Sequence, residues 1–549
     1  NPDAETLRCA NLWKDDKHFS VLQCSFGNPA DNRNYAISKS SGKYVTLCDG
    51  DDLMSESWLA KAYEMARSQG DEDFVLRPAV HLQFGYEEKN VTAWFMRDSV
   101  DKKTDAIQMA YWNLWTIMLF STRKVLEETP FRPSLNGFGF EDYLFNADTR
   151  AKNIPHLTVP GTVLFYRRRS ESVSSEHLGT VLDYSDLFDV SYIKSIPLPK
   201  NGNGTSSISH TMKAVAKRTY RFAFDAAKKI GPLNRAMYPV ARNMLYKNKS
   251  KKLPTNILLQ WKKINKIENQ LYPTKGEVAK LQFHPLSFDP FNSTLGVIYQ
   301  RLCHAISKNK IDYLFLAPHM SGRGGTEKLI TNYIRALQNI YPNWNIAILS
   351  TQPYNQTVLD YFKDLNVDML DFGGLTRGLG DYEKYIIWSR ILIQSKVKRL
   401  HIVNDAYWYH WASRHQKLLI NNDFKIYISL FMREFVHEPD RIMSFADPDL
   451  VQIWPTVTKV FTDNKKVISD ALINNAFEPE KLVTHYQPQD FSNICRPKHI
   501  NPDKPIRILW ASRISHQKRP DILKKVANKL GSGFIIDAYG LIEKKQYKP

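Results

Sequence analysis

An acidic segment near the N-terminus combines residue types that can hold a cation. Asp49–Asp52 reads Asp-Gly-Asp-Asp and follows directly after Tyr44–Cys48, a short β-prone run. Carboxylates at the carboxyl end of a parallel strand lie where open α/β sheets bind ligands, and two of them one residue apart can hold a hard divalent cation that bridges phosphate oxygens. The same residues also suit an ordinary turn that caps the following helix. Both interpretations remain open on this segment alone.

Two further places carry groups that could act on a ligand. Pro318–Lys328 is a glycine-rich turn between a strand and a helix, where glycines let the backbone approach an anion or a sugar hydroxyl closely. Arg513 and Lys518 lie in a loop after another strand, and two cations just before a helix N-terminus suit a pyrophosphate without a metal. The alternatives are a simple strand-to-helix connection and a solvated charged loop.

The elements that must position these groups alternate along the chain as in α/β proteins. In the first part we expect strands at 44–48, 74–76 and 162–166 and a helix over 57–69. In the second part the expected strands are 313–317, 345–350, 367–370, 399–403, 426–430 and 460–462, with helices between them. Parallel strands joined by helices predict a doubly wound sheet. A further strand, helix and strand are expected at 506–511, 520–530 and 534–539.

Composition excludes several classes of protein. The 549 residues are 43% hydrophobic and 24% charged, which is too apolar and aromatic for a disordered chain. No uncharged apolar stretch is long enough to span a bilayer. The five cysteines are scattered and contain no CxxC, which argues against a disulfide framework and a zinc site and favours a reducing cytoplasm.

The positive charge is concentrated in one segment. Residues 201–280 hold 17 Lys and Arg against 3 Asp and Glu, a net +14 of the chain's +19. Such a cationic segment with interspersed aromatic residues suits an anionic membrane surface or a solvated helical linker, and we expect no nucleic acid partner because no recognition module accompanies it. The expected domains are therefore 1–190, a basic helical connector at 191–305, then 306–500 and 501–549.

Three motifs in order give the first part a family resemblance. The run from Asn32 to Asp52, the Gly139–Tyr143 segment with its Glu-Asp pair, and the Leu164–Arg168 segment with its Tyr-Arg-Arg resemble the family 2 glycosyltransferases of the GT-A fold. The resemblance implies transfer of a sugar from a nucleotide-sugar donor with Mn²⁺ or Mg²⁺. Because this chain starts downstream of the family's opening strand, we expect a fragment that lacks part of its donor pocket.

The resemblance also implies roles for individual residues. Asp49 and Asp51 would serve the cation, which neutralises the departing diphosphate. Asp142 would be the base that removes the acceptor hydroxyl proton, with Glu141 as the fallback, because two adjacent acids point in different directions. Arg33 and Asp52 would lie on the donor side. An exposed helix start for the acidic pair, and surface ion pairing for Arg33, are the plain alternatives.

The second part resembles a different family. Gly324-Gly325-Thr326-Glu327 matches the glycine turn of the family 4 glycosyltransferases of the GT-B fold, and Ile508–Pro520 looks like the first strand and loop of their nucleotide-binding domain. The resemblance implies that Gly324, Gly325, Arg513 and Lys518 bind a donor and that this half needs no metal. Its Glu-x7-Glu donor motif would lie beyond Pro549.

Together these resemblances predict a bifunctional enzyme. We expect an inverting, metal-dependent GT-A domain and a retaining, metal-independent GT-B domain that extend a cell-surface polysaccharide, such as O-antigen or capsule, on a lipid-linked acceptor. The expected location is the cytoplasm, with peripheral attachment to the inner face of the plasma membrane. Two alternatives stay open: one half is catalytic and the other a scaffold, or the protein binds polyanions or membranes without catalysis.

Overall fold

The computed structural model of the chain describes residues 4–84, 92–134, 140–167, 183–199, 255–268, 282–285, 290–318, 320–322, 324–430, 434–435, 442–443, 447–469, 477–488, 505–512 and 520–540. The chain divides into two compact units. The larger unit comprises Asn1–Ser429 with Gln452–Val460, and the smaller comprises Leu430–Val451 with Phe461–Pro549.

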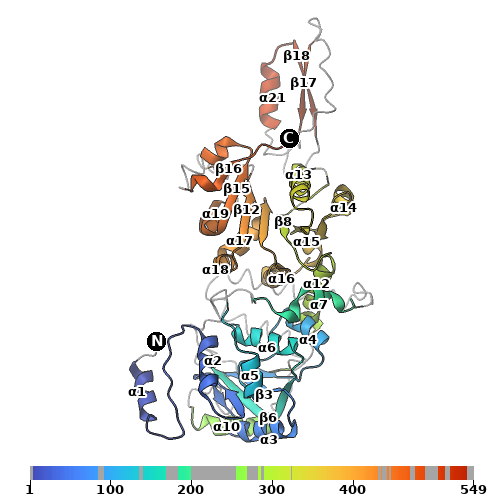
Figure 1. The fold of residues 1–549 in the computed structure, drawn as a ribbon. Helices are drawn as coiled ribbons and strands as arrows, with labels where there is room; N and C mark the ends of the chain where they lie inside the picture. Colours follow the sequence, from blue (N-terminus) through green and yellow to red (C-terminus); the bar gives the residue numbers. More distant parts are fainter. Residues whose placement is uncertain are drawn as a thin grey trace. The chain divides into compact units, whose positions relative to one another are not determined.

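We call the described residues between 4 and 304 the first region. A mixed sheet of seven strands forms its centre (Figure 1). Its strands are β1 (Tyr44–Leu47), β2 (Leu53–Met54), β3 (Val75–Phe84), β4 (Thr92–Phe95), β5 (Leu119–Thr122), β6 (His156–Arg167) and β7 (Gln282–Pro285). Neighbours run in the order β1-β5-β3-β4-β7, and β6 pairs with both β3 and β2. β3 runs parallel to β6 and antiparallel to β4 and β5. The α/β class predicted for this region is confirmed.

Strand β1 forms where its residues predict it, but its place in the sheet differs from the prediction. It pairs antiparallel with β5, from Tyr44 opposite Thr122 to Leu47 opposite Leu119. Among the described strands β5 is its one partner, and its residues are only half-buried. The expectation of a parallel strand before the acidic segment is therefore wrong. A β-prone run predicts extended backbone, whereas the direction of its neighbour is decided by a distant part of the chain.

Helices cover both faces of this sheet. α3 (Trp58–Ser68) packs through Trp58, Ala62 and Ala66 on one face. α2 (Pro29–Lys39), α5 (Arg123–Glu128) and α6 (Glu141–Ala151) share a core on the other, and Figure 1 shows α3 across β3 and β6 from α5 and α6. Further helices of this part are α1 (Ala4–Leu12), α4 (Lys102–Met109), η2 (Asp186–Phe188) and α7 (Val190–Ser195).

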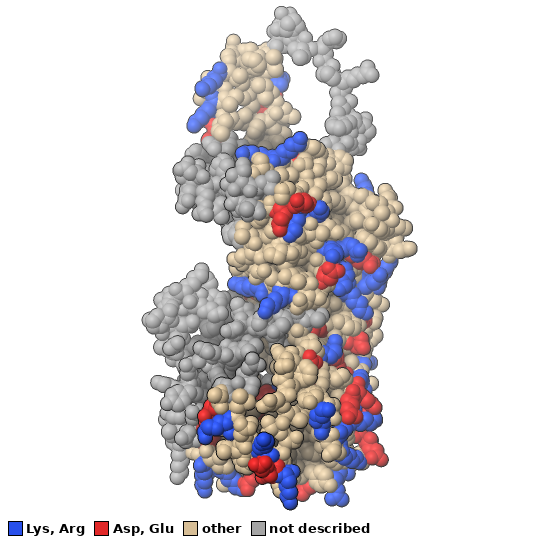
Figure 2. Space-filling model, turned by 60° about the vertical axis from the view of Figure 1, so that its left-hand side comes forward, with Lys and Arg blue, Asp and Glu red and all other residues tan. Residues whose placement is uncertain are grey.

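Part of the range expected as a connector belongs to the first region. α10 (Thr255–Asn265) buries Ile257, Trp261 and Ile264 against β3 and β6. β7 pairs parallel with β4, and α12 (Pro290–His304) packs against α4 and α7. Most of the basic residues of 201–280 lie outside the described residues, so their membrane role stays a prediction. On the face drawn in Figure 2, many of the described Lys and Arg lie close to Asp and Glu.

We call the described residues from β8 to the end of β16, between 313 and 484, the second region. A second sheet of seven strands forms its centre. Its strands are β8 (Tyr313–Ala317), β9 (Ile346–Ser350), β10 (Asp368–Leu370), β11 (Arg399–Val403), β12 (Lys425–Ser429), β15 (Val457–Thr462) and β16 (Leu482–Thr484). Their order is β10-β9-β8-β11-β12-β15-β16, and β8, β9, β10, β11 and β12 pair parallel. The chain thus moves outward on one side of β8 and then continues on the other, so the prediction of a doubly wound parallel sheet is confirmed.

Helices connect the strands of the second sheet. They are α13 (Gly325–Ile340), α14 (Gln356–Phe362), α15 (Phe372–Leu375), α16 (Asp381–Gln394), α17 (Ala406–Arg414), α18 (Gln416–Asn421) and α19 (Asp447–Ile453), with the short elements β13 (Glu434–Phe435), β14 (Ile442–Met443), η3 (Trp454–Thr456) and η4 (Pro479–Lys481). No described helix is long and apolar enough to cross a membrane.

The last described elements form a small parallel pair. β17 (Ile506–Ala511) lies beside β18 (Phe534–Tyr539), with α21 (Pro520–Lys529) between them in sequence. These bounds agree with the strand, helix and strand that the sequence predicts. Four cysteines of the described part, Cys9, Cys24, Cys48 and Cys303, are free thiols.

Candidate active site

The acidic segment after β1 is both a turn and a concentration of negative charge. The backbone N–H of Asp52 donates to the carbonyl of Asp49 at 3.1 Å, which closes the turn. The Asp49 side chain is 37% exposed, and Asp51 is half-buried. The two interpretations of this segment are therefore compatible, because the turn brings three carboxylates together instead of separating them.

Asp52 is the buried member of this group. Its Oδ1 accepts a hydrogen bond from the backbone N–H of Arg167 at 2.9 Å, whereas its Oδ2 is buried without a hydrogen-bond partner among the described residues. Burial, together with the charges of Asp51 and Asp49, raises the pKa of Asp52 to about 7, against the lowering effect of that hydrogen bond. The described residues thus supply too few donors and positive charges to offset the three carboxylates of this segment.

Arg33 connects the acidic segment to a second acidic place far along the chain. It lies on α2, whose first turn is capped by Asn28. Its guanidinium donates to Oδ1 of Asp49 at 2.8 Å and to Oε1 of Glu141. Burial alone would lower the pKa of Arg33, but the two carboxylates outweigh burial and raise it. The ion pairing predicted as the plain alternative for Arg33 is present, and both of its partners are predicted site residues.

Glu141 and Asp142 begin helix α6, and the chain enters this helix in an unusual conformation. Phe140, the residue before it, has φ 66° in the left-handed region. A bulky residue rarely adopts this conformation, and such strain is found preferentially at functional sites. Glu141 is buried at 9% exposure, which disfavours the alternative of an exposed helix start. Gly139 of the same motif lies outside the described residues.

Asp142 is held by two donors. Asn113 Nδ2 donates to Oδ2 at 3.1 Å, and the backbone N–H of Tyr143 donates to Oδ1 at 2.7 Å. Burial, together with the charge of Glu141, raises the pKa of Asp142 to about 7, while Arg33 and Arg77 act in the opposite direction. A carboxyl group with this pKa changes its protonation near neutral pH, which suits a general base.

A buried polar chain behind Asp142 was not predicted from the sequence. Asn146 donates to Oδ1 of Asn113 and to the carbonyl of Trp115, each at 2.9 Å. Arg77 donates in turn to Oδ1 of Asn146 and is 1% exposed. Burial lowers the pKa of Arg77 to about 9. The sequence feature that could have indicated this chain of contacts is Arg77 within the largely apolar run of β3. Arginine is rarely buried in a strand unless it has hydrogen-bond or ion-pair partners.

Arg167, at the end of β6, holds the acidic segment from the other side. Its Nε donates to the carbonyl of Asp51 at 2.9 Å, and its Nη2 pairs with Glu268 at 2.6 Å. These contacts show Arg167 in an ion pair and as a support of the acidic loop.

The surroundings of Asp49 and Asp51 suit a divalent cation. The orphaned Oδ2 of Asp52 and the crowding of three carboxylates both favour the arrival of positive charge. Among the described residues, no group of three or more His, Cys, Asp and Glu side chains could hold a metal ion. Oxygen atoms of a bound phosphate would therefore have to complete the coordination, as Mg²⁺ sites with one or two carboxylates do.

In the second region, the carboxylate of Glu327 accepts hydrogen bonds from the backbone of the glycine turn. Gly324 precedes α13 and Gly325 begins it. The backbone N–H groups of Ser321 and Gly322 donate to Oε1 of Glu327, which is 1% exposed. Two donors of the turn are thus occupied by the protein, and the donor-binding role of Gly324 and Gly325 stays a prediction. Arg513 and Lys518 lie outside the described residues.

A comparison with protein families assigns part of the first region. Residues 3–129 match the family described as glycosyl transferase family 2. No curated protein matches. Among solved structures, a glycosyltransferase from Rickettsia africae ESF-5 is similar, at 14% identity over 42% of this chain and 69% of that chain, with a TM-score of 0.28. The N-terminal region of this chain is therefore a glycosyltransferase family 2 domain.

Proposed function

We propose that the first region transfers a sugar from a nucleotide-sugar donor to an acceptor hydroxyl group, with a divalent cation at Asp49 and Asp51. The observation that carries the proposal is the double contact of Arg33 with Asp49 and Glu141. This contact brings the acidic segment after β1 and the acidic start of α6 to the same place, although they lie far apart in the sequence. A cation at the acidic segment and a base at the start of α6 would then lie close enough to serve a donor and an acceptor that are bound together.

The chemistry divides between the two acidic places. The cation, Mn²⁺ or Mg²⁺, would neutralise the charge that develops on the departing diphosphate. Asp49 and Asp51 would hold it, while Asp52, fixed by the backbone of Arg167, would keep the segment in place on the donor side. Arg33 sets the distance between the donor side and α6 by its contacts with both.

Asp142 is the better candidate for the base. Glu141 is engaged by Arg33, whereas Asp142 is oriented by Asn113 and has a pKa raised to about 7. In its ionised form Asp142 takes the proton of the acceptor hydroxyl while that oxygen attacks the anomeric carbon. The bond from the anomeric carbon to the diphosphate breaks, and the diphosphate leaves with the electron pair. Attack from the side opposite the leaving group inverts the anomeric configuration.

We propose a second, metal-independent and retaining transferase in the second region as the further candidate. The doubly wound sheet and the start of α13 at Gly325 directly after the glycine turn favour it. Arg513 and Lys518 would hold the donor diphosphate there. A bifunctional enzyme of this kind would extend a lipid-linked surface polysaccharide such as O-antigen or capsule at the cytoplasmic face of the membrane.

The segment 201–280 would provide the membrane contact in this proposal. Its net charge of +14 predicts binding to vesicles that contain anionic lipid, weakened by salt. Equal binding of the full chain to neutral and anionic vesicles would contradict an electrostatic attachment.

The test of the proposed function is sugar transfer by the full chain with a panel of nucleotide-sugar donors, with Mn²⁺ or Mg²⁺ and with a chelator. We expect transfer that the chelator abolishes, and we expect Asp51→Asn to remove this metal-dependent part alone. Asp71→Asn is the matched control, because Asp71 is a fully exposed acid of the same region, 3.7 Å from Lys43. Full metal-dependent activity in Asp51→Asn would refute the assignment.

A further inference from the structure

Helix α16 of the second region is buried on more than one side. Every residue from Tyr385 to Gln394 is buried, including Arg390 and Gln394. A helix that packs on one sheet alone keeps a polar exposed face, so burial around this helix means that a second body covers it. The covering elements come from the first region: α12 packs against α16, α4 and α7. All of these elements lie in the larger compact unit.

Arg390 reaches from α16 into the first region. It is 2% exposed, and no carboxylate among the described residues pairs with it. Its Nε donates to the carbonyl of Ala110 at 3.0 Å, and its guanidinium lies 4.5 Å from the ring centre of Phe188. Burial lowers the pKa of Arg390. An arginine buried without an acid is costly, so its carbonyl and aromatic contacts are what keep it there.

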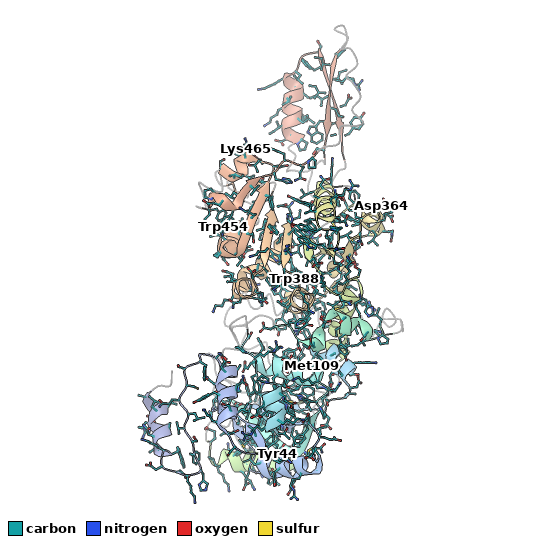
Figure 3. The ribbon with its side chains drawn as sticks, viewed as in Figure 1. Tyr44, Met109, Asp364, Trp388, Trp454 and Lys465 are labelled. Carbon is teal, nitrogen blue, oxygen red and sulfur yellow. The ribbon has the colours of Figure 1, made fainter. Side chains whose placement is uncertain are left out.

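A second contact of Arg390 leads to the base. Its Nη2 is 3.4 Å from Oη of Tyr143, the residue after Asp142, and the Tyr143 hydroxyl donates to the carbonyl of Met109. Figure 3 labels Met109 at the end of α4 and Trp388 on α16, two residues before Arg390. Arg390 therefore contacts both the 109–113 segment and the start of α6.

These two segments are the ones whose side chains meet in the site. Asn113 follows Ala110, Asp142 precedes Tyr143, and Asn113 donates to Asp142 at 3.1 Å. A displacement of either segment would lengthen this hydrogen bond and turn the carboxylate. One helical turn beyond Arg390, Gln394 exchanges hydrogen bonds with the backbone of Asp183 and Ser185 at 3.1 and 3.2 Å, which fixes α16 against the first region.

We propose that Arg390 is a positioning residue for the transfer reaction of the first region: it holds the Asn113 and Asp142 segments together from the second region. This inference rests on the proposed function, in which Asp142 is the base. The second region is then required for the activity of the first, whether or not it transfers sugar itself.

The test compares Arg390→Ala and Arg390→Lys with Arg414→Ala in the full chain. Arg414 is the matched control, because it donates to the Tyr385 hydroxyl at 3.2 Å and lies over that ring, wholly within the second region. We expect Arg390→Ala to lower kcat of metal-dependent transfer by about tenfold or more, as small misplacements of catalytic groups do. The donor KM should stay close to wild type, and Arg390→Lys, which keeps the charge but loses the planar fork, should also lower kcat.

Chemical rescue separates positioning from a general loss of folding. Added guanidinium ion should restore part of the kcat of Arg390→Ala and none of the activity of Asp142→Asn. If Arg390→Ala does not fold, Arg390→Lys carries the test, with a lowered kcat at an unchanged donor KM as the expected result. Wild-type kcat in a folded Arg390→Lys or Arg390→Ala chain would overturn the inference.

Hydrogen exchange provides a readout that does not need activity. We expect faster exchange in peptides covering 105–113 and 141–151 in both Arg390 variants and unchanged exchange there in Arg414→Ala. Should the wild-type chain transfer no sugar, the proposed function fails, and exchange still decides whether Arg390 holds these segments. Unchanged protection of both segments in the Arg390 variants would overturn the positioning role.

Discussion

The two regions use their acidic side chains differently. In the first region, Asp49 and Glu141 face each other across Arg33, and Asp52 keeps one buried oxygen without a partner in the described chain. In the second region, Glu327 accepts from two backbone N–H groups of the glycine turn, and Asp405 accepts from Thr351 Oγ1 at 2.7 Å and from a helix N–H. An acid whose oxygens are filled by nearby donors stabilises a loop, whereas acids gathered beside one another can still bind a cation.

The largest effect that distinguishes the two regions is expected at Asp142. Asp142→Asn should lower kcat of metal-dependent transfer by about 100- to 10,000-fold, because the amide cannot accept the hydroxyl proton. Steady-state kinetics of the full chain measure this. Asp148→Asn is the control on the same helix, because Asp148 pairs with Arg132 at 2.7 Å away from the acidic segment. Equal losses in both variants would show that α6 is merely sensitive to substitution.

The pH dependence should reveal the environment of Asp142. Its pKa of about 7 predicts that kcat/KM falls about tenfold per pH unit below that value, because the protonated carboxyl cannot act as a base. Asn113→Ala removes a hydrogen bond to the ionised form and should move the inflection to higher pH. An inflection near the ordinary carboxyl value of 3.8 would contradict the assignment.

The same group also links pH to stability. Its pKa in the folded chain lies above the ordinary value of 3.8, so the folded state binds the proton more tightly than the unfolded state does. The contribution of Asp142 to the free energy of unfolding should therefore decrease as the pH rises from about 4 to about 7. Comparing urea unfolding of wild type and Asp142→Asn across this range isolates that contribution, and an opposite slope would contradict it.

The sequence predicted the elements well where burial follows a local pattern. The largely apolar runs of β8 and β11 have the expected bounds, because such runs form strands that neighbours cover on both faces. β17 also has its expected bounds, although its described residues are mostly exposed. β1 was predicted by the same reasoning, but its antiparallel partner depends on a distant segment. Local patterns therefore indicate where strands occur and much less well how they pair in a mixed sheet.

The acidic residues of the candidate site could be predicted from the sequence, whereas the residues that hydrogen-bond to them and orient them mostly could not. Asp49, Asp51 and Asp142 stand in short motifs, whereas the contacts of Arg33 join residues far apart in sequence. The link from Asn113 through Asn146 to Arg77 has no sequence motif, since each residue acts through the folded backbone. Such supporting residues become visible only when distant segments are in contact.

A smaller effect is expected where α12 packs against α4 within the first region. A Cβ on Gly296 would lie 1.8 Å from the carbonyl oxygen of Ile107. Gly296→Ala should therefore force α12 away from α4 and lower the free energy of unfolding by about 1–3 kcal/mol. Thermal or urea unfolding measures this. Gly531→Ala is the control, because a Cβ there meets nothing within 4 Å, and equal destabilisation of both variants would argue against close packing at Gly296.

The smallest effect is expected at Glu327 of the second region, whose carboxylate already accepts two backbone hydrogen bonds. Glu327→Gln keeps an acceptor oxygen for the N–H groups of Ser321 and Gly322, so it should cost about 1 kcal/mol. Glu327→Ala leaves both donors without this acceptor and should cost more. Neither variant should change metal-dependent transfer. Loss of that activity in Glu327→Gln would mean that the acids of the two regions do not differ as described.

The most direct test of the central claim is calorimetric titration of the full chain with nucleoside diphosphates, with and without Mn²⁺, because it requires neither the sugar nor the acceptor. The arrangement of Asp49, Asp51 and Arg33 predicts a binding component that depends on Mn²⁺ and that Asp51→Asn removes, while Asp71→Asn retains it. Binding that is the same with and without Mn²⁺, or a Mn²⁺-dependent component that survives in Asp51→Asn, would contradict a cation site in the first region.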